Sequence, residues 1–173
     1  SWSKKFKNFR LEGRANMNYS TVNTEVNGRQ NTNNTFSQTY RAEIGTNFSK
    51  YPNIELQYAY TRNDYSGAVN NSIFTNHAPG IELTAVLWDD FVFRSDYRYN
   101  NYGNPGDSRT VYDFLNASLE YQKKDSKWLF SIEALNLLNT SFIREDALSA
   151  NLISTTSYTV LPRFLMLGVR YDL

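Results

Sequence analysis

The chain has 173 residues, no cysteine, and a formal net charge of +1 from 18 basic and 17 acidic residues. This near balance excludes the basic surface of a nucleic-acid-binding protein, and the lack of cysteine excludes disulfides, thiolate metal sites and a cysteine nucleophile. Aromatic residues make up 16% of the chain, although its mean hydropathy is -0.58. The longest apolar runs, such as residues 83–88, fall far short of the roughly 18 residues that a transmembrane helix needs.

Eight stretches alternate apolar and polar residues with a period of two, which predicts antiparallel β-strands with one apolar and one polar side. The clearest runs from Phe9 to Tyr19, where odd positions are largely apolar and even positions carry Arg10, Glu12 and Arg14. The length predicts a single domain. The predicted strands span about residues 9–19, 36–48, 54–61, 74–87, 91–99, 112–122, from 128 onward, and 158–173.

Two places interrupt the alternation. From Leu135 to Leu138 the pattern fails, and we expect a β-bulge there, with a helix over Ser131 to Asn139 as the alternative. Residues 140–156 form the longest polar stretch, in which EDALSAN at 145–151 is compatible with a short helix. At the start of the chain, residues 3–8 are expected to turn after a strand that ends at Trp2.

The connections between the predicted strands are of two kinds, which alternate along the chain. The segments 49–53, 88–90 and 123–127 are short, whereas 23–34, 63–73, 100–110 and 140–156 are long and polar. Short periplasmic turns and long external loops are typical of outer-membrane β-barrels, and aromatic residues gather at both ends of the strands, as two membrane interfaces require. We therefore expect strands that face outer-membrane lipid. A soluble β-sandwich also alternates and remains an alternative.

The last strand carries a more particular signal. Leu165, Leu167 and Val169 share an apolar side, whereas Arg170 lies on the other. A glycine, an aromatic residue three positions later and a hydrophobic residue two positions after that resemble the terminal assembly signal of bacterial outer-membrane β-barrels. The residues of this signal are Gly168, Tyr171 and Leu173. The resemblance implies the barrel-assembly machinery as a partner.

Three segments support a family resemblance: FKNFRLEGRANMNYS at 6–20, YDFLNASLEYQKKDSKWLFSIEALNLLNT at 112–140 and PRFLMLGVRYDL at 162–173. They resemble the closing strands of TonB-dependent outer-membrane receptors, in particular the outer-membrane β-barrel family that follows a plug in such receptors. Asn-Leu-Leu-Asn at 136–139 is similar to the Asn-Leu-Phe-Asn that commonly stands near the end of the penultimate strand of that family.

The resemblance implies that residues 1–173 are the C-terminal part of a transmembrane barrel of about 22 strands in the bacterial outer membrane, with the plug domain upstream of Ser1. It also implies energised uptake of a large solute through the TonB system, with a surface lipoprotein as lid. The alternative is a stand-alone, eight-stranded OmpA-type barrel with a structural or adhesive role, in which inward charges pair across the lumen.

Candidate binding residues lie where aromatics and amides mix in the long connections and the upper lumen. For ligand contact these are Tyr65, Asn70, Tyr102, Asn104 and Tyr112. An outer-membrane barrel enzyme with a serine, histidine and acid arrangement would have to use His77, the one histidine, but no serine motif accompanies it and we expect it at a rim or in a loop. The sequence predicts no catalytic residue, metal or cofactor, and adjacent Asp89 and Asp90 are expected to form a tight turn.

Overall fold

The computed structural model describes residues 1–26, 28–67, 71–106, 109–149 and 152–172, and the regular elements of these ranges are all β-strands. This confirms the predicted all-β, antiparallel fold. No helix in the described ranges is long and apolar enough to cross a membrane. The strands are β1 (Trp2–Phe6), β2 (Phe9–Val26), β3 (Arg29–Thr46), β4 (Asn53–Ser66), β5 (Asn71–Leu87), β6 (Phe91–Gly103), β7 (Thr110–Tyr121), β8 (Trp128–Leu135), β9 (Phe142–Ser149), β10 (Leu152–Thr159) and β11 (Phe164–Tyr171).

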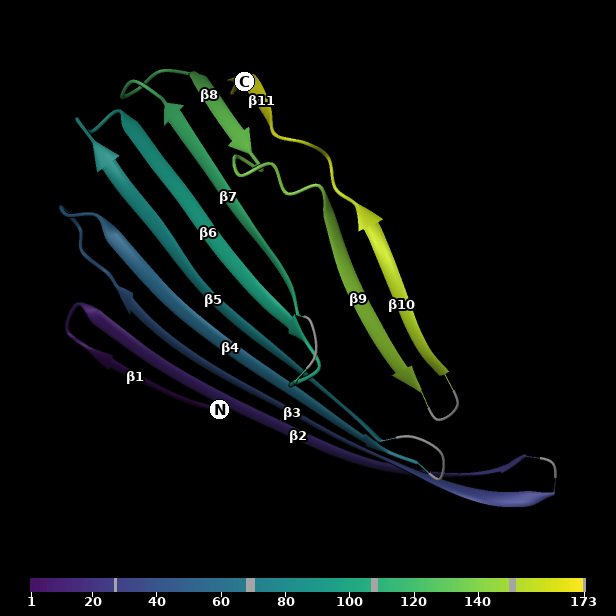
Figure 1. Cartoon of the computed structure of the whole chain (residues 1–173). Coiled ribbons are helices and arrows are strands. Elements are labelled where there is room, and N and C mark those ends of the chain that lie inside the picture. Colours follow the sequence, from purple (N-terminus) through teal and green to yellow (C-terminus); the bar gives the residue numbers. More distant parts are fainter. Residues whose placement is uncertain (27, 68–70, 107–108, 150–151, 173) are drawn as a thin grey trace.

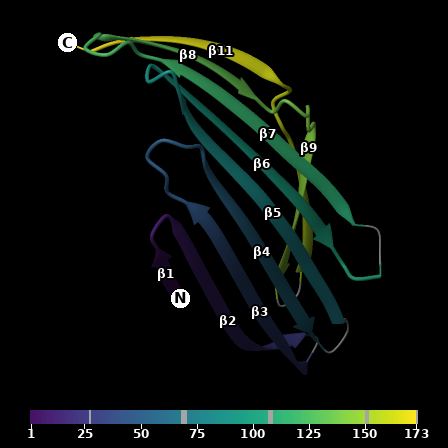
Figure 2. The same ribbon diagram turned by 90° about the vertical axis from the view of Figure 1, so that its left-hand side faces the viewer.

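Nine of these strands form one antiparallel sheet, and β9 pairs with β10 in a separate hairpin. In the large sheet the order follows the chain from β1 to β8, and β11 then pairs with β8. Figures 1 and 2 show this sheet as a single curved layer, with the β9–β10 hairpin next to β7. The sheet is open, because β1 lies at one edge and β11 at the other.

The strand register sorts the side chains onto two sides of the sheet, because residues directly opposite each other in antiparallel strands point the same way. One row of such partners crosses the sheet from β2 to β7 and is apolar throughout: Leu11, Ile44, Leu56, Ile81, Tyr97 and Leu115. A second apolar row joins Leu119, Ile132 and Leu167 across β7, β8 and β11. We call this side the outer face and the opposite side the inner face.

The outer face is largely uncovered. Leu165, Leu167 and Val169 are 64%, 75% and 64% exposed. The buried apolar residues are Tyr65 and Ala85, and no large side chain in the described ranges is fully buried. A soluble β-sandwich needs a packed centre between two layers, and the described residues form no such centre.

Tryptophan occurs on the outer side of this layer. Trp2 lies directly opposite Gly13, and Trp128 lies opposite Tyr171 with the two ring centroids 4.8 Å apart. Trp88 stands in the short β5–β6 connection with its ring against that of Phe91. All three indoles are substantially exposed.

Most of the expected long loops are in fact extensions of the strands. β2 continues to Val26 and β3 begins at Arg29, within the segment 23–34. The expected loops at 63–73 and 100–110 are shortened in the same way by β4 to β7. These extensions are rich in Asn, Thr and Ser, so their sequences show no hydrophobic period. Their backbones nevertheless pair regularly, and the Thr32 hydroxyl donates a hydrogen bond of 2.9 Å to the Asn23 side chain on the neighbouring strand.

The prediction for residues 140–156 was wrong. The segment forms β9 and β10 rather than a loop with a short helix, and the two strands pair from Phe142 opposite Thr159 to Ser149 opposite Leu152. At the start of the chain, β1 continues to Phe6, whereas residues 3–8 are expected to turn. In both cases pairing with a neighbouring strand supplies backbone hydrogen bonds that local sequence does not reveal.

Asn-Leu-Leu-Asn at 136–139 is the point where the chain leaves the large sheet between β8 and β9. Asn136 and Asn139 have φ values of 51° and 59°, a backbone conformation that asparagine tolerates better than most residues. The Asn136 side chain is 5% exposed; its Nδ2 donates to the carbonyls of Thr140 and Leu161, each at 2.8 Å, and its Oδ1 accepts the Thr140 N–H at 2.9 Å.

The interruption expected from Leu135 to Leu138 is therefore a tight loop between β8 and the β9–β10 hairpin, rather than a simple bulge. The helical alternative was wrong, because β8 is a strand up to Leu135. The Asn136 side chain holds together the two chain segments on either side of the β9–β10 hairpin. This segment thus fixes the position at which the hairpin leaves the sheet.

Candidate functional site

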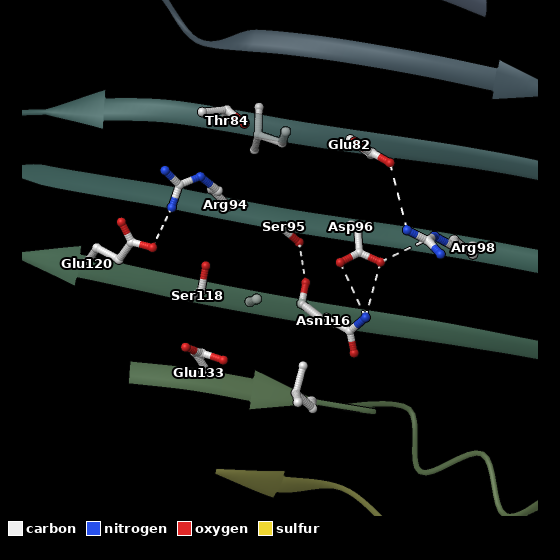
Figure 3. Close-up of a pocket in the computed structure, with 13 residues that line it drawn as sticks. Glu82, Thr84, Arg94, Ser95, Asp96, Arg98, Asn116, Ser118, Glu120 and Glu133 are labelled. Carbon is white, nitrogen blue, oxygen red and sulfur yellow. Dashed lines mark hydrogen bonds and ion pairs between the residues drawn. The ribbon is translucent and has the colours of Figure 1, made fainter. Parts of the chain in front are cut away.

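The inner face carries a hollow of about 390 Å³ over β5 to β8 (Figure 3). Arg94 donates to Glu120 at 2.6 Å, and Arg98 lies between two carboxylates, 3.9 Å from Glu82 and 3.7 Å from Asp96. The residues that line the hollow are Glu82, Leu83, Thr84, Arg94, Ser95, Asp96, Arg98, Asn116, Ala117, Ser118, Glu120, Glu133 and Leu135.

The register explains why these charges form a network. Glu55, Glu82 and Asp96 stand directly opposite one another on β4, β5 and β6, and like charges in that position repel. Arg98, two residues along β6 from Asp96, compensates part of this repulsion. On the other side Asn116 is opposite Asp96 and donates its amide to both carboxylate oxygens, at 3.1 and 3.3 Å. The three carboxylates of Glu55, Glu82 and Asp96 are therefore stabilised by the guanidinium and amide groups beside them.

A further ion pair reaches across a whole strand. Arg10 on β2 donates to Glu55 on β4 at 2.6 Å, over the intervening Gly45 of β3. A Cβ added at Gly45 would lie 3.4 Å from Glu55 Oε2, so the glycine leaves the room through which the two side chains meet. Close approach of this kind is a recognised reason for glycine in a strand.

Other charges on the inner face are compensated within a single strand. Residues two apart on a strand share a side, so an arginine and a carboxylate at this spacing can meet. This arrangement occurs in the pairs Arg14 with Glu12 and Arg41 with Glu43, and Arg170 of β11 pairs in the same way with Asp172, which directly follows that strand. Each pair keeps part of its surface in solvent, as expected for a wet wall rather than a dry core.

Toward the long-connection ends of β2 to β7, the inner face changes character. Between the charged rows and the last residue pair of β2 and β3, its positions carry amides, hydroxyls, small apolar side chains and aromatic rings. We call these positions the neutral region: Asn16, Asn18, Ser20, Val22 and Thr24; Asn31, Asn33, Thr35, Ser37 and Thr39; Ala59, Thr61, Asn63 and Tyr65; Ser72, Phe74, Asn76 and Ala78; Asn100 and Tyr102; Thr110 and Tyr112.

Three of the predicted ligand residues lie in the neutral region. Tyr65 is 8% exposed and donates its hydroxyl to Asn33 Oδ1 at 3.0 Å. Tyr102 stacks on Phe74, with ring centroids 6.0 Å apart and planes 15° apart, and Tyr112 meets Phe114 edge to face at 6.3 Å. The prediction that these tyrosines contact a ligand stays a prediction.

The other two predicted ligand residues are placed differently. Asn104 comes directly after the last residue of β6, and Asn70 lies outside the described residues. Phe74 and Asn33 are not among the predicted ligand residues, because residues 74–80 (FTNHAPG) do not alternate clearly and residues 23–34 are expected to form a long polar connection. The inner-face parity of their strands would have identified both.

His77 lies on the outer face of β5, opposite Tyr60. A hydrogen bond of 2.7 Å joins its Nδ1 to the Tyr58 hydroxyl, and its ring centroid is 4.9 Å from that of Tyr60. In the described part of the chain, no group of three or more histidine or acidic residues is placed to hold a metal ion.

Two residues of the predicted assembly signal lie in β11. Gly168 is opposite Ser131, whose hydroxyl occupies the space that a Cβ at Gly168 would need. Tyr171 packs its ring against Trp128, and Lys127 Nζ lies 5.7 Å from the Tyr171 ring centroid. Leu173 lies outside the described residues.

No family model matches the chain, and neither the curated proteins nor the solved structures contain a match to it.

Proposed function

We propose that the chain forms part of the wall of a transmembrane β-barrel in the bacterial outer membrane, within a TonB-dependent receptor that takes up a large solute. The observation that carries the proposal is the contrast between the two sides of one sheet. Apolar rows cross the outer face without cover, and charged and polar rows cross the inner face. Hydrocarbon outside and a wet interior would satisfy both sides.

The exposed apolar surface supports a lipid environment. Monomeric soluble proteins rarely expose contiguous apolar patches of more than a few hundred Å², whereas here large apolar side chains are exposed on successive outer-face positions of β4, β8 and β11. Leaving such surface in water costs about 25 cal/mol per Å². Lipid chains would remove this cost without any second layer of protein.

The open edges support a barrel larger than these strands alone. In a bilayer every backbone N–H and C=O must find a partner, and β1 and β11 each have an edge that pairs with no described strand. A stand-alone eight-stranded barrel would need those edges to pair with each other, yet among the described strands β1 pairs with β2 alone and β11 with β8 alone. Further strands that pair with both edges would complete the wall.

The remaining parts of the proposal come from the resemblance of the sequence. A plug inside the barrel would face the charged inner rows, where Arg94, Arg98 and the neighbouring carboxylates provide polar partners. The TonB system would act through that plug, and a surface lipoprotein would close the outer mouth. The barrel-assembly machinery would recognise the end of β11.

Single cysteines provide the test, since the chain has none of its own. Leu119→Cys would place a thiol on the outer face and Ser118→Cys would place one next to it on the inner face of β7. In intact outer membranes from cells that produce the protein, we expect a water-soluble maleimide to label Ser118→Cys and not Leu119→Cys. Equal labelling of the two variants would contradict the proposal.

A further inference from the structure

The lysines of the chain are confined to one end of the sheet, where the short turns lie. All seven are exposed. They are Lys4 and Lys5 near the end of β1, Lys7 directly after it, Lys50 between β3 and β4, and Lys123, Lys124 and Lys127 between β7 and β8. Lys5 points to the inner face, because it stands opposite Arg10. We call the other six lysines the lysine rim.

The charge of the lysine rim is not neutralised within the sheet. In the described ranges the cation of every side-chain ion pair is an arginine. The short turns contain three aspartates, Asp89, Asp90 and Asp125, against the six lysines of the rim. The turns β1–β2 and β3–β4, which are joined by a hydrogen bond of 2.8 Å from Asn47 N–H to the Asn8 carbonyl, contain no acidic residue. This end therefore presents a surplus of positive charge.

Two ammonium groups of the lysine rim lie at the margin of the apolar outer face. Lys4 stands on that face opposite Leu11, and its Nζ lies 4.9 Å from the ring centroid of Phe6, which is two residues nearer the turn. Lys127 places its Nζ over the ring of Tyr171 in the same manner. A lysine that lays its aliphatic stem along apolar surface and turns its charge toward water behaves as lysines do at a membrane interface.

An uncovered apolar surface that ends in unneutralised ammonium groups matches the two parts of an anionic phospholipid. Acyl chains would cover the outer face, and the negative headgroup would meet the lysines. An acidic protein would neutralise the charge but leave the adjoining apolar surface exposed. We propose that the lysine rim binds the headgroups of anionic phospholipids in the leaflet that faces the periplasm. This inference rests on the proposed function, which puts the short turns at that leaflet.

The test uses the full-length protein in phosphatidylcholine bilayers that contain a small fraction of one photoreactive phospholipid. The two probes are phosphatidylglycerol, which is anionic, and phosphatidylcholine, which is zwitterionic, each with the same diazirine in one acyl chain. Mass spectrometry of peptic digests measures the lipid cross-linked to β1 and β8. A lysine near an anionic surface contributes a factor of about five, so we expect phosphatidylglycerol to cross-link at least about fivefold more. Equal cross-linking would overturn the inference in favour of an acidic protein as the occupant.

Salt tests whether the preference is electrostatic. At about 1 M salt the Debye length falls to about 3 Å, so the cross-linking of the two probes should become nearly equal. A preference for phosphatidylglycerol that is unchanged at this salt concentration would overturn the inference.

Two adjacent lysines of β1 provide matched variants. Lys4→Gln removes an ammonium group from the outer face, and Lys5→Gln removes one from the inner face. Lys4→Gln should lower the preference for phosphatidylglycerol at β1 by about fivefold, whereas Lys5→Gln should leave it unchanged. Lys127→Gln should lower the preference at β8 by the same factor. Equal losses for Lys4→Gln and Lys5→Gln would overturn the inference.

The cysteine-labelling assay separates this inference from the proposed function. A protein that labels on the inner face alone but shows no preference for phosphatidylglycerol would overturn the lipid assignment and leave the proposed function standing. A protein that labels equally on both faces would overturn the proposed function and the lipid assignment together.

Discussion

The two faces of the sheet satisfy their side chains in opposite ways. On the inner face, charges meet partners within the sheet itself, as Arg94 meets Glu120 and Arg10 reaches Glu55 across Gly45. On the outer face, Leu165, Leu167 and Val169 have most of their surface uncovered. The charged side chains of the inner face are therefore compensated within the sheet and can remain in contact with water. The apolar side chains of the outer face, in contrast, require an apolar environment that the described chain does not supply.

The largest effect is expected from a charge on the outer face. Leu167→Arg or Leu119→Arg should destabilise the membrane-inserted fold by about 2–4 kcal/mol, because the guanidinium would enter hydrocarbon. The free energy of unfolding, measured by urea titration in phospholipid bilayers, gives the value. The matched variant is Ser118→Arg, next to Leu119 on the inner face, which should cost much less.

Similar losses for Leu119→Arg and Ser118→Arg would show that the two faces have the same environment. The contrast between the faces would then have no physical basis.

The next effect concerns a polar residue that follows the outer-face positions of β8. Asn136 continues the even-numbered series of Trp128 to Ala134, but it is buried and bonded to backbone groups. Asn136→Ala should cost about 1–3 kcal/mol, because two carbonyls and an N–H lose their partner. The same urea titration measures this loss, and Asn18→Ala, an exposed asparagine on β2, is the control. A loss no greater than that of the control would show that the Asn136 contacts are dispensable.

A smaller effect is expected at the edge strand. Tyr171→Ala and Trp128→Ala each remove the same ring contact, worth about 0.5–1.5 kcal/mol beyond area burial. If Tyr171 also belongs to an assembly signal, Tyr171→Ala should lower the amount of protein in the outer membrane more than Trp128→Ala does. Quantitative blotting of membrane fractions compares the two. Equal amounts would reduce the role of Tyr171 to packing.

The smallest effect belongs to the inner face. A double-mutant cycle on Arg10 and Glu55 should give a coupling free energy below about 1 kcal/mol, since both side chains remain partly solvated. Urea titration of the two single variants and the double variant provides this value. A coupling of several kcal/mol would mean that this part of the inner face is dry, and would weaken the contrast with the outer face.

Sequence alternation predicted the two-faced strands well. From Phe9 to Tyr19 every second side chain contrasts with its neighbour, and the register places these residues as expected. From Phe93 to Tyr99 the contrast holds at all positions except Ser95. The short turns were also predictable, because Trp88 to Asp90 and Lys123 to Lys127 break the pattern between two apolar runs.

The strand extensions could not be predicted in this way. From Tyr19 to Val26 and from Arg29 to Phe36, both faces include polar residues, so hydrophobic periodicity does not distinguish strand from loop. β9 and β10 are hidden for a related reason, because they pair with each other beyond the Asn136 loop, where the apolar period has ended. The diagonal alignment of Tyr65, Phe74, Tyr102 and Tyr112 on the inner face emerges only once the register between strands is known.

The placement of the three tryptophans has a practical consequence. Since Trp2, Trp88 and Trp128 all belong to the outer side or its turn, their emission samples the surroundings of the sheet and ignores the lumen. Brominated acyl chains should quench it upon insertion, whereas a solute bound on the inner face should leave it unchanged.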